Sequence, residues 1–353
     1  MGRKRQSLRL ARSRASREDS DMTSPLPIPS LDDLRAARTR IAGHAAVTPL
    51  LHSPALDAAV GGTVLLKAEV LQHTGSFKLR GALNRMLQLS AADRTRGVVA
   101  YSSGNHAQAV AYSARLLGMP AVIVMPKDAP AIKIERTRGF GAEVVLYDRY
   151  TEDREAIGGA IAAERGATVV PPFEDPAVVA GQGTLALEGL EQAAQRGHQV
   201  DQLLVCCGGG GLTAGCALAA EGVSPRTRVH PVEPVHFDDM ARSLEQGHRV
   251  KNEPGHQSIC DAIVTPTPGA FTFGICQPRV GAGLRVSDEQ VLAAIAFAVR
   301  ELKLVVEPGG AAALAAALSG QLPTAGRTTM VVVTGGNIDP GILARAVGVD
   351  GAA

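Results

Sequence analysis

One lysine in this chain stands where an amine could be held for covalent chemistry. Lys78 lies in the segment Gly75-Ser76-Phe77-Lys78-Leu79-Arg80-Gly81-Ala82, beside an aromatic residue and between glycines, a few residues after an apolar run. An amine forms an imine with a carbonyl compound when it is fixed and partly desolvated, and a glycine-flanked turn beside a ring suits a flat aldehyde cofactor. A solvated surface lysine is the ordinary alternative, so other segments must decide.

Three further segments place polar or glycine-rich turns directly after apolar, strand-like runs. Ser102-Ser103-Gly104-Asn105-His106 precedes a helical pattern at residues 109–117, which suits an anion site at a helix start or an ordinary N-cap. Cys207-Gly208-Gly209-Gly210-Gly211-Leu212 exposes backbone N–H groups that can converge on a phosphate. Thr334-Gly335-Gly336-Asn337 puts a neutral hydroxyl at the carboxyl end of a strand, where open α/β sheets bind ligands.

In this order, the four segments resemble those of fold type II pyridoxal-phosphate enzymes, and within that group the threonine/serine dehydratase and serine racemase family. The resemblance runs from about residue 30 to the C-terminus and includes Thr48-Pro49-Leu50 and Glu307-Pro308-Gly309-Gly310-Ala311. It implies a tryptophan synthase β-like α/β fold with two open, twisted, mostly parallel sheets flanked by helices. It also implies a large domain of residues 30–96 and 175–353, a small domain of residues 97–174, and a cofactor in the cleft between them.

The resemblance assigns one group of residues to the cofactor, pyridoxal 5'-phosphate. Lys78 would hold it as a Schiff base, Asn105 would bind the ring hydroxyl, and Thr334 would face the ring nitrogen. The other residues of the group are Phe77 against the ring and Gly208, Gly209, Gly210, Gly211 and Leu212 around the phosphate.

A second group would face an amino-acid substrate, namely Ser102, Ser103, His106 and Arg154. Lys78 would take the α-proton, and Ser103 would be the second acid or base that racemisation needs. The implied reaction is β-elimination, with L-threonine giving 2-oxobutanoate and ammonia, and L-serine giving pyruvate as a side activity. Two alternatives stay open: a serine racemase, and a threo-3-hydroxyaspartate ammonia-lyase, which is favoured if Arg154 points into the cleft and can bind a second carboxylate.

A metal site is implied after the strand-like run that ends near Val232. The resemblance gives Mg²⁺ or Ca²⁺ the carboxylates of Glu233 and Asp239 and the backbone carbonyl of Phe237, and oxygen ligands are what a hard divalent cation prefers. The alternative is a solvated acidic loop.

The amino-acid composition limits the classes of protein to which the chain can belong. The 353 residues are 45% hydrophobic and only 3% aromatic, with no tryptophan, so stacking platforms for nucleic acid are scarce and no membrane span is expected. Five cysteines without a C-x-x-C pair are predicted to be small buried hydrophobes in a reducing compartment. We therefore expect a cytoplasmic enzyme that is a homo-oligomer (dimer or tetramer), with a small-molecule partner and neither nucleic acid nor membrane.

Residues 1–29 differ in character from the rest of the chain. They hold seven basic and three acidic residues and then a Pro/Ser stretch, so the net charge of +2 arises in this tail. A disordered basic tail is the expected structure, unless the chain starts at Met22.

Overall fold

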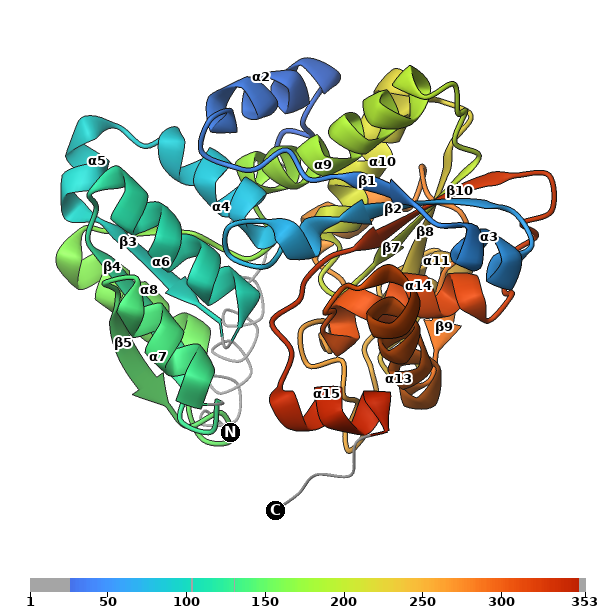
Figure 1. Ribbon diagram of the computed structural model, residues 1–353. Helices are drawn as coiled ribbons and strands as arrows, with labels where there is room; N and C mark the ends of the chain where they lie inside the picture. Colours follow the sequence, from blue (N-terminus) through green and yellow to red (C-terminus); the bar gives the residue numbers. More distant parts are fainter. Residues whose placement is uncertain (1–25, 103, 130, 349–353) are drawn as a thin grey trace, which may run out of the picture.

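The computed structural model describes residues 26–102, 104–129 and 131–348, and within these ranges the strands form two separate sheets (Figure 1). The larger sheet has six strands in the order β1-β2-β10-β7-β8-β9, all parallel except β1, which is antiparallel to β2. The smaller sheet has four parallel strands in the order β5-β4-β3-β6. Two open, mostly parallel sheets with helices around them confirm the predicted fold class.

The strands of the larger sheet come from both the N-terminal and the C-terminal parts of the described chain. Its strands are β1 (Leu50–His52), β2 (Thr63–Ala68), β7 (Gln202–Cys206), β8 (Arg228–Pro234), β9 (Leu284–Val286) and β10 (Thr328–Val333). The helices before the smaller sheet are α2 (Leu31–Ile41), α3 (Pro54–Val60), the 3₁₀ turn η1 (Glu69–Leu71) and α4 (Lys78–Leu87). Those after it are α9 (Pro176–Gln195), α10 (Gly211–Val223), α11 (Asp239–Gln246), α12 (Ala270–Cys276), α13 (Asp288–Phe297), the π-turn η2 (Ala298–Leu302), α14 (Pro308–Leu318) and α15 (Pro340–Val347).

The smaller sheet forms from one continuous stretch. Its strands are β3 (Val98–Tyr101), β4 (Ala121–Pro126), β5 (Glu143–Tyr147) and β6 (Thr168–Val169), with α5 (Ala91–Arg96), α6 (Asn105–Leu117), α7 (Ala131–Gly139) and α8 (Arg154–Arg165) before or between them. All four strands fall inside residues 97–174, and we propose that this stretch is the small domain expected from the sequence, with residues 30–96 and 175–353 forming the large one. The two groups of elements are seen side by side in Figure 1.

Local sequence signals account for most of these elements. The segment Ser30-Leu31-Asp32-Asp33 predicts a capping box, and Ser30 does cap α2 in a capping box with Asp33. Asp339 caps α15, with Pro340 as the first residue of the helix. The sequence predicts strands from short β-branched runs at residues 64–67, 98–101, 121–125, 143–146, 203–206, 228–232 and 329–333, and these became β2, β3, β4, β5, β7, β8 and β10. The short strands β1, β6 and β9 were not predicted, because two or three residues are too few to show a periodicity.

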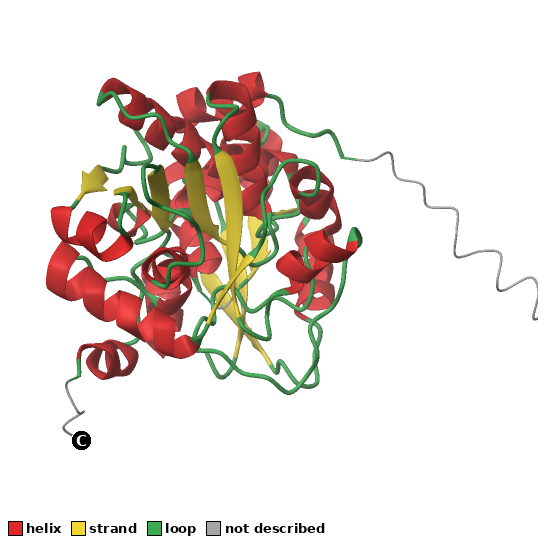
Figure 2. Ribbon diagram, turned by 90° about the vertical axis from the view of Figure 1, so that its right-hand side faces the viewer, coloured by secondary structure: helices red, strands yellow, loops and turns green. Residues whose placement is uncertain are grey.

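Helix α4 joins the two halves of the molecule. Its Lys78 end lies against β10, since the Phe77 N–H donates to the Thr334 carbonyl at 3.0 Å. Ala82 and Met86, further along the helix, are fully buried in the apolar cluster of the smaller sheet. Figure 2 shows helices on both sides of the strands, as is usual for mostly parallel sheets. A residue at the start of α4 is therefore held between the two sheets.

Three other sequence expectations concern regions outside these sheets. The predicted basic tail, residues 1–29, lies outside the described residues except for residues 26–29. All five cysteines are free and buried, as predicted. None of the helices in the described ranges is both long and apolar enough to cross a membrane.

Candidate active site

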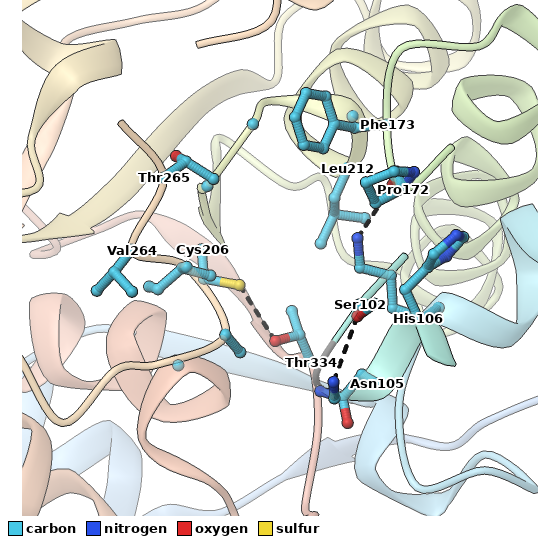
Figure 3. Close-up of a pocket in the computed structure, with 18 of the residues that line it drawn as sticks. Ser102, Asn105, His106, Pro172, Phe173, Cys206, Leu212, Val264, Thr265 and Thr334 are labelled. Carbon is cyan, nitrogen blue, oxygen red and sulfur yellow. Dashed lines mark hydrogen bonds between the residues drawn. The ribbon is translucent and has the colours of Figure 1, made fainter. Parts of the chain in front are cut away.

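A cavity lies between the two sheets, where several strands present their carboxyl ends (Figure 3). Tyr101 ends β3 and Ser102 follows it, Cys206 ends β7, and Thr334 follows β10, and all four line the cavity. The predicted cofactor and substrate residues in the described chain also line it, namely Phe77, Lys78, Ser102, Asn105, His106, Arg154, Gly208, Gly209, Gly210, Gly211, Leu212 and Thr334. Segments far apart in the sequence therefore meet in one place, as the order of strands in an open α/β fold requires.

Lys78 is a half-buried amine at the wall of the cavity. Its Nζ donates to the Pro172 carbonyl at 3.1 Å and lies 5.3 Å from the centre of the Phe77 ring. Burial lowers the pKa of Lys78 to about 8, because desolvation disfavours the charged ammonium. A lysine of this kind is neutral in an appreciable fraction of molecules near neutral pH and can act as a nucleophile or a base.

The glycine loop between β7 and α10 has the properties of an anion site. Gly210 has a φ of +92°, a left-handed conformation that favours glycine, and α10 starts at Gly211 without a side-chain cap. No described residue accepts a hydrogen bond from the backbone N–H groups of residues 208–212. The Thr213 hydroxyl is also buried without a partner among the described residues. Unpaired donors at a helix start, with the helix dipole behind them, fit a phosphate group.

The loop after β3 presents a second helix start to the cavity. Gly104 stands at the N-cap position of α6 and Asn105 is its first residue, so Asn105 is not the N-cap; Ser103 lies outside the described residues. His106 is buried, with Nε2 bonded to the Val170 carbonyl at 2.8 Å. Burial and the Lys78 charge lower the pKa of His106 to about 3, so this ring stays neutral.

Glu307 is a cavity residue to which sequence reasoning gave no role. It is 3% exposed and precedes α14, and its Oε1 accepts a hydrogen bond from Nδ2 of Asn105 at 2.5 Å. Burial raises the pKa of Glu307 to about 7. The Asn105 amide is further fixed by Asn337, whose Nδ2 donates to Oδ1 of Asn105 at 2.8 Å. The sequence feature that could have indicated a role for Glu307 is its place directly before the Pro308-Gly309-Gly310 segment.

Two cationic side chains from the helices around the smaller sheet also line the cavity. Lys133 of α7 pairs with Asp261, which precedes α12, at 2.7 Å, and so it spans the cleft. Arg154, the first residue of α8, has its guanidinium carbon 5.8 Å from the centre of the Tyr101 ring. None of the carboxylates in the described ranges lies within ion-pairing distance of Arg154, which leaves its charge available for a ligand.

The expected metal ligands lie away from this cavity, between β8 and α11. Glu233 accepts from the N–H groups of Met240 and Ala241 at 2.9 and 2.8 Å, and Asp239 accepts from Asn252 at 2.6 Å. Both carboxyls are buried, which raises the pKa of Glu233 and that of Asp239, the latter to about 7. The residues that the structure describes contain no group of three or more His, Cys, Asp or Glu side chains suited to a metal ion, so the predicted Mg²⁺ or Ca²⁺ site is not shown.

Comparison with known proteins agrees with the chemistry of this cavity. Residues 41–335 match the family described as "Pyridoxal-phosphate dependent enzyme". The chain belongs to this family. Within it, the chain is 42% identical to an L-threo-3-hydroxyaspartate ammonia-lyase of Saccharomyces cerevisiae, covering 88% of this chain and 94% of the relative. It is 41% identical to a serine racemase of Schizosaccharomyces pombe, covering 90% and 97%.

A solved structure of a similar protein leads to the same family. The crystal structure of a T.th. threonine deaminase has a TM-score of 0.83 and 46% identity, and it covers 88% of this chain and 99% of that chain. The resemblance to the threonine/serine dehydratase and serine racemase group, and the fold type II architecture, are thus confirmed. The site fits the family's cofactor: Lys78 supplies a desolvated amine, and the glycine loop with the orphaned Thr213 hydroxyl supplies donors for a phosphate. The chain is a pyridoxal-phosphate enzyme of the ammonia-lyase and racemase type.

Proposed function

We propose that the enzyme is an ammonia-lyase for a hydroxy amino acid with a second carboxylate, L-threo-3-hydroxyaspartate. The observation that carries this is Arg154, which lines the cavity without a carboxylate partner among the described residues. A guanidinium binds a carboxylate through two parallel hydrogen bonds, whereas the methyl group of threonine cannot form a hydrogen bond with it. From the sequence alone, L-threonine is the first expectation, and the dicarboxylic substrate is favoured only if Arg154 points into the cleft.

The proposed reaction removes water and then ammonia. Lys78 takes the α-proton, the β-hydroxyl leaves as water, and the enamine product hydrolyses to oxaloacetate and ammonia. When bound, pyridoxal phosphate withdraws electrons from the α-carbon. Lys78 is suited to the proton transfer because its lowered pKa, about 8, lies close to neutral pH.

The other cavity residues would orient the substrate and the cofactor. The start of α6, with Ser102 and His106, would bind the α-carboxylate, and the glycine loop would bind the phosphate. Asn105 has a second N–H on Nδ2, which it could give to the ring hydroxyl while Glu307 accepts the first. Thr334 carries no charge, so it cannot hold a ring nitrogen protonated as a carboxylate would. This property supports elimination over transamination.

Two other activities are kept as alternatives. L-Threonine and L-serine would be dehydrated by the same residues, without the Arg154 contact. Serine racemisation would need Ser103 as the second acid or base, and that residue lies outside the described ranges. A cytoplasmic location and a homo-oligomer, dimer or tetramer, stay predictions; the free, buried cysteines suit a reducing compartment.

Binding of Mg²⁺ or Ca²⁺ by Glu233, the Phe237 carbonyl and Asp239 also stays a prediction. Its one support is the Oδ2 atom of Asp239, which is buried without a hydrogen-bond partner among the described residues. A cation bound only by the folded protein raises its stability. A chelator should then lower the melting temperature of the wild type and not that of Asp239→Asn, and equal behaviour of the two would exclude the site.

The substrate proposal is tested by steady-state kinetics on three amino acids. We expect kcat/KM to be highest for L-threo-3-hydroxyaspartate, ahead of L-threonine and L-serine. Arg154→Gln should lower kcat/KM for 3-hydroxyaspartate by roughly 10- to 100-fold, because a hydrogen bond to a charged group is worth about 1.5–3 kcal/mol. The same variant should change turnover of L-threonine by less than about twofold.

A matched control is Arg149→Gln, since Arg149 is an exposed arginine of the loop before α8 that pairs with Asp128 and does not line the cavity. It should behave as the wild type with all three substrates. A wild-type preference for L-threonine, or an equal loss on both substrates in Arg154→Gln, would overturn the proposal. Chiral analysis of L-serine incubations decides the racemase alternative, because D-serine formed faster than ammonia would favour it.

A further inference from the structure

We propose that Cys206 is a positioning residue of the cofactor site, whose thiol fixes the orientation of the Thr334 hydroxyl. The inference rests on the proposed function in one respect, namely that Thr334 faces the ring nitrogen of the cofactor. It gives a role to a cysteine that the sequence analysis took for a small buried hydrophobe. Cys206 acts through Thr334 in this account and takes no part in covalent chemistry.

The geometry comes from two neighbouring parallel strands. Cys206 is the last residue of β7 and Thr334 directly follows β10, and the two strands pair in parallel, so their carboxyl ends lie together. The Cys206 Sγ and Thr334 Oγ1 atoms are 3.1 Å apart, and Figure 3 shows them joined at the wall of the cavity. Both residues are nearly fully buried, at 4% and 3% exposure, so water does not compete for this contact.

The protonation state of the thiol allows it to be a donor. Burial raises the pKa of Cys206 to about 11, while the contact with Thr334 lowers it; the charged groups that face it are Glu307 and Lys78. The sulfur therefore keeps its hydrogen near neutral pH. A thiol is a weak donor and a hydroxyl is both donor and acceptor, so the pair can be ordered with the S–H given to Oγ1 of Thr334.

The direction of the Cys206–Thr334 hydrogen bond determines what Thr334 offers to the cofactor. If Oγ1 accepts from the thiol, the hydroxyl's own hydrogen is free for an unprotonated ring nitrogen. With the reverse order, Oγ1 would present a lone pair, which suits only a protonated nitrogen. Cys206 thus selects the orientation in which Thr334 donates, and this matches a neutral ring nitrogen and elimination chemistry.

Two other cysteines show that burial alone does not produce this contact. Cys207, the next residue, also lines the cavity, but its thiol points to the Gly208 carbonyl at 3.4 Å. Cys216 of α10 is fully buried and does not line the cavity. Cys216→Ala is therefore the matched control, since it removes a buried thiol of equal size without touching Thr334.

The test compares holoenzymes by the visible absorption spectrum of the bound cofactor, by its pH dependence and by kcat and KM. Cys206→Ala should change the spectrum and lower kcat by ~2- to 10-fold with KM unchanged, as for the loss of one neutral hydrogen bond. Cys206→Ser keeps a donor and should restore the wild-type spectrum. Cys216→Ala should match the wild type. If Cys206→Ala does not fold, Cys206→Val, which is close to cysteine in size and lacks the donor, replaces it.

A double variant tests whether Cys206 acts through Thr334. In Thr334→Val, adding Cys206→Ala should have no further effect on the spectrum or kcat, because the partner is already gone. The proposal is overturned if Cys206→Ala has the wild-type spectrum and kcat, if Cys206→Ser behaves like Cys206→Ala, or if the two substitutions act independently. The spectrum is read without substrate, so an error in the proposed substrate leaves this test intact.

Discussion

Two clusters of charged side chains each include a residue from the first turn of α4, Arg80 in one and Lys78 in the other, and they are built in opposite ways. In the first, Lys67, Arg80, Glu69 and Glu188 pair with one another: Lys67 lies 2.6 Å from Glu188, and Arg80 lies 2.8 Å from Glu69 and 3.1 Å from Glu188. In the second, the cavity, the side chains of Lys78 and Glu307 form hydrogen bonds only with neutral groups among the described residues, namely the Pro172 carbonyl and the Asn105 amide. We call them the paired cluster and the cavity.

The pKa values of Glu188 and Glu307 differ in the way that this pairing predicts. The pKa of Glu188 is lowered although burial opposes this, because Arg80 and Lys67 favour the carboxylate. The pKa of Glu307 is raised to about 7, because burial outweighs the hydrogen bond from Asn105 and the distant Lys133 charge. Removing one member of a buried pair leaves an unpaired charge and destabilises the fold, whereas perturbed charges without a partner in a cavity mark a candidate ligand site.

The largest effect should come from removing the cavity's amine. Lys78→Ala loses both the covalent anchor of the cofactor and the base, and we expect ammonia release to fall by about 10³-fold or more. Lys78→Arg, which keeps the charge but cannot replace the amine, should be equally inactive. Substantial turnover in either variant would remove Lys78 from the mechanism.

Breaking the paired cluster should instead reduce stability. Glu188→Gln leaves Lys67 and Arg80 buried with one counter-charge between them, and we expect a loss of about 3–5 kcal/mol in the free energy of unfolding, measured with urea. The control is Glu143→Gln, which breaks the exposed pair with Arg165 and should cost less than about 1 kcal/mol. Equal losses would mean that burial of the cluster does not matter.

Removing the unpaired glutamate should have a smaller effect, and one that depends on pH. Because the pKa of Glu307 is raised on folding, the wild-type apoprotein should lose stability as pH rises from about 4.5 to about 7. Glu307→Gln lacks this loss, so it should be more stable than the wild type at pH 8, by roughly 3 kcal/mol at most, and similar at pH 4. For Glu188→Gln the sign reverses: the deficit is present above the ordinary glutamate pKa and shrinks at lower pH. Parallel pH profiles for the two variants would contradict the comparison.

The sequence predicted the residues that stand next to a turn signal. Lys78, Asn105, the four glycines and Thr334 all follow apolar runs that became strands or lie at helix starts, and they line one cavity. What local patterns could not show were contacts between distant segments. The Pro172 carbonyl on Lys78, Glu307 on Asn105 and the Lys133–Asp261 pair across the cleft each join residues more than 90 positions apart.

The same limit explains why the contact made by Cys206 was missed. An adjacent cysteine pair in an apolar strand indicates buried hydrophobes, and both cysteines are indeed buried. Only the pairing of β7 with β10 brings the Cys206 thiol to Thr334, 128 positions away.

The most direct test of the account locates the cofactor on the chain. Holoenzyme is reduced with borohydride, digested and analysed by mass spectrometry, which finds the lysine that carries the reduced pyridoxyl group. We expect the label on Lys78, which lines the cavity and has a lowered pKa, and none on Lys67, which is held by Glu188. A label on Lys67 or on another lysine, or no label in a protein that contains the cofactor, would contradict the central claim.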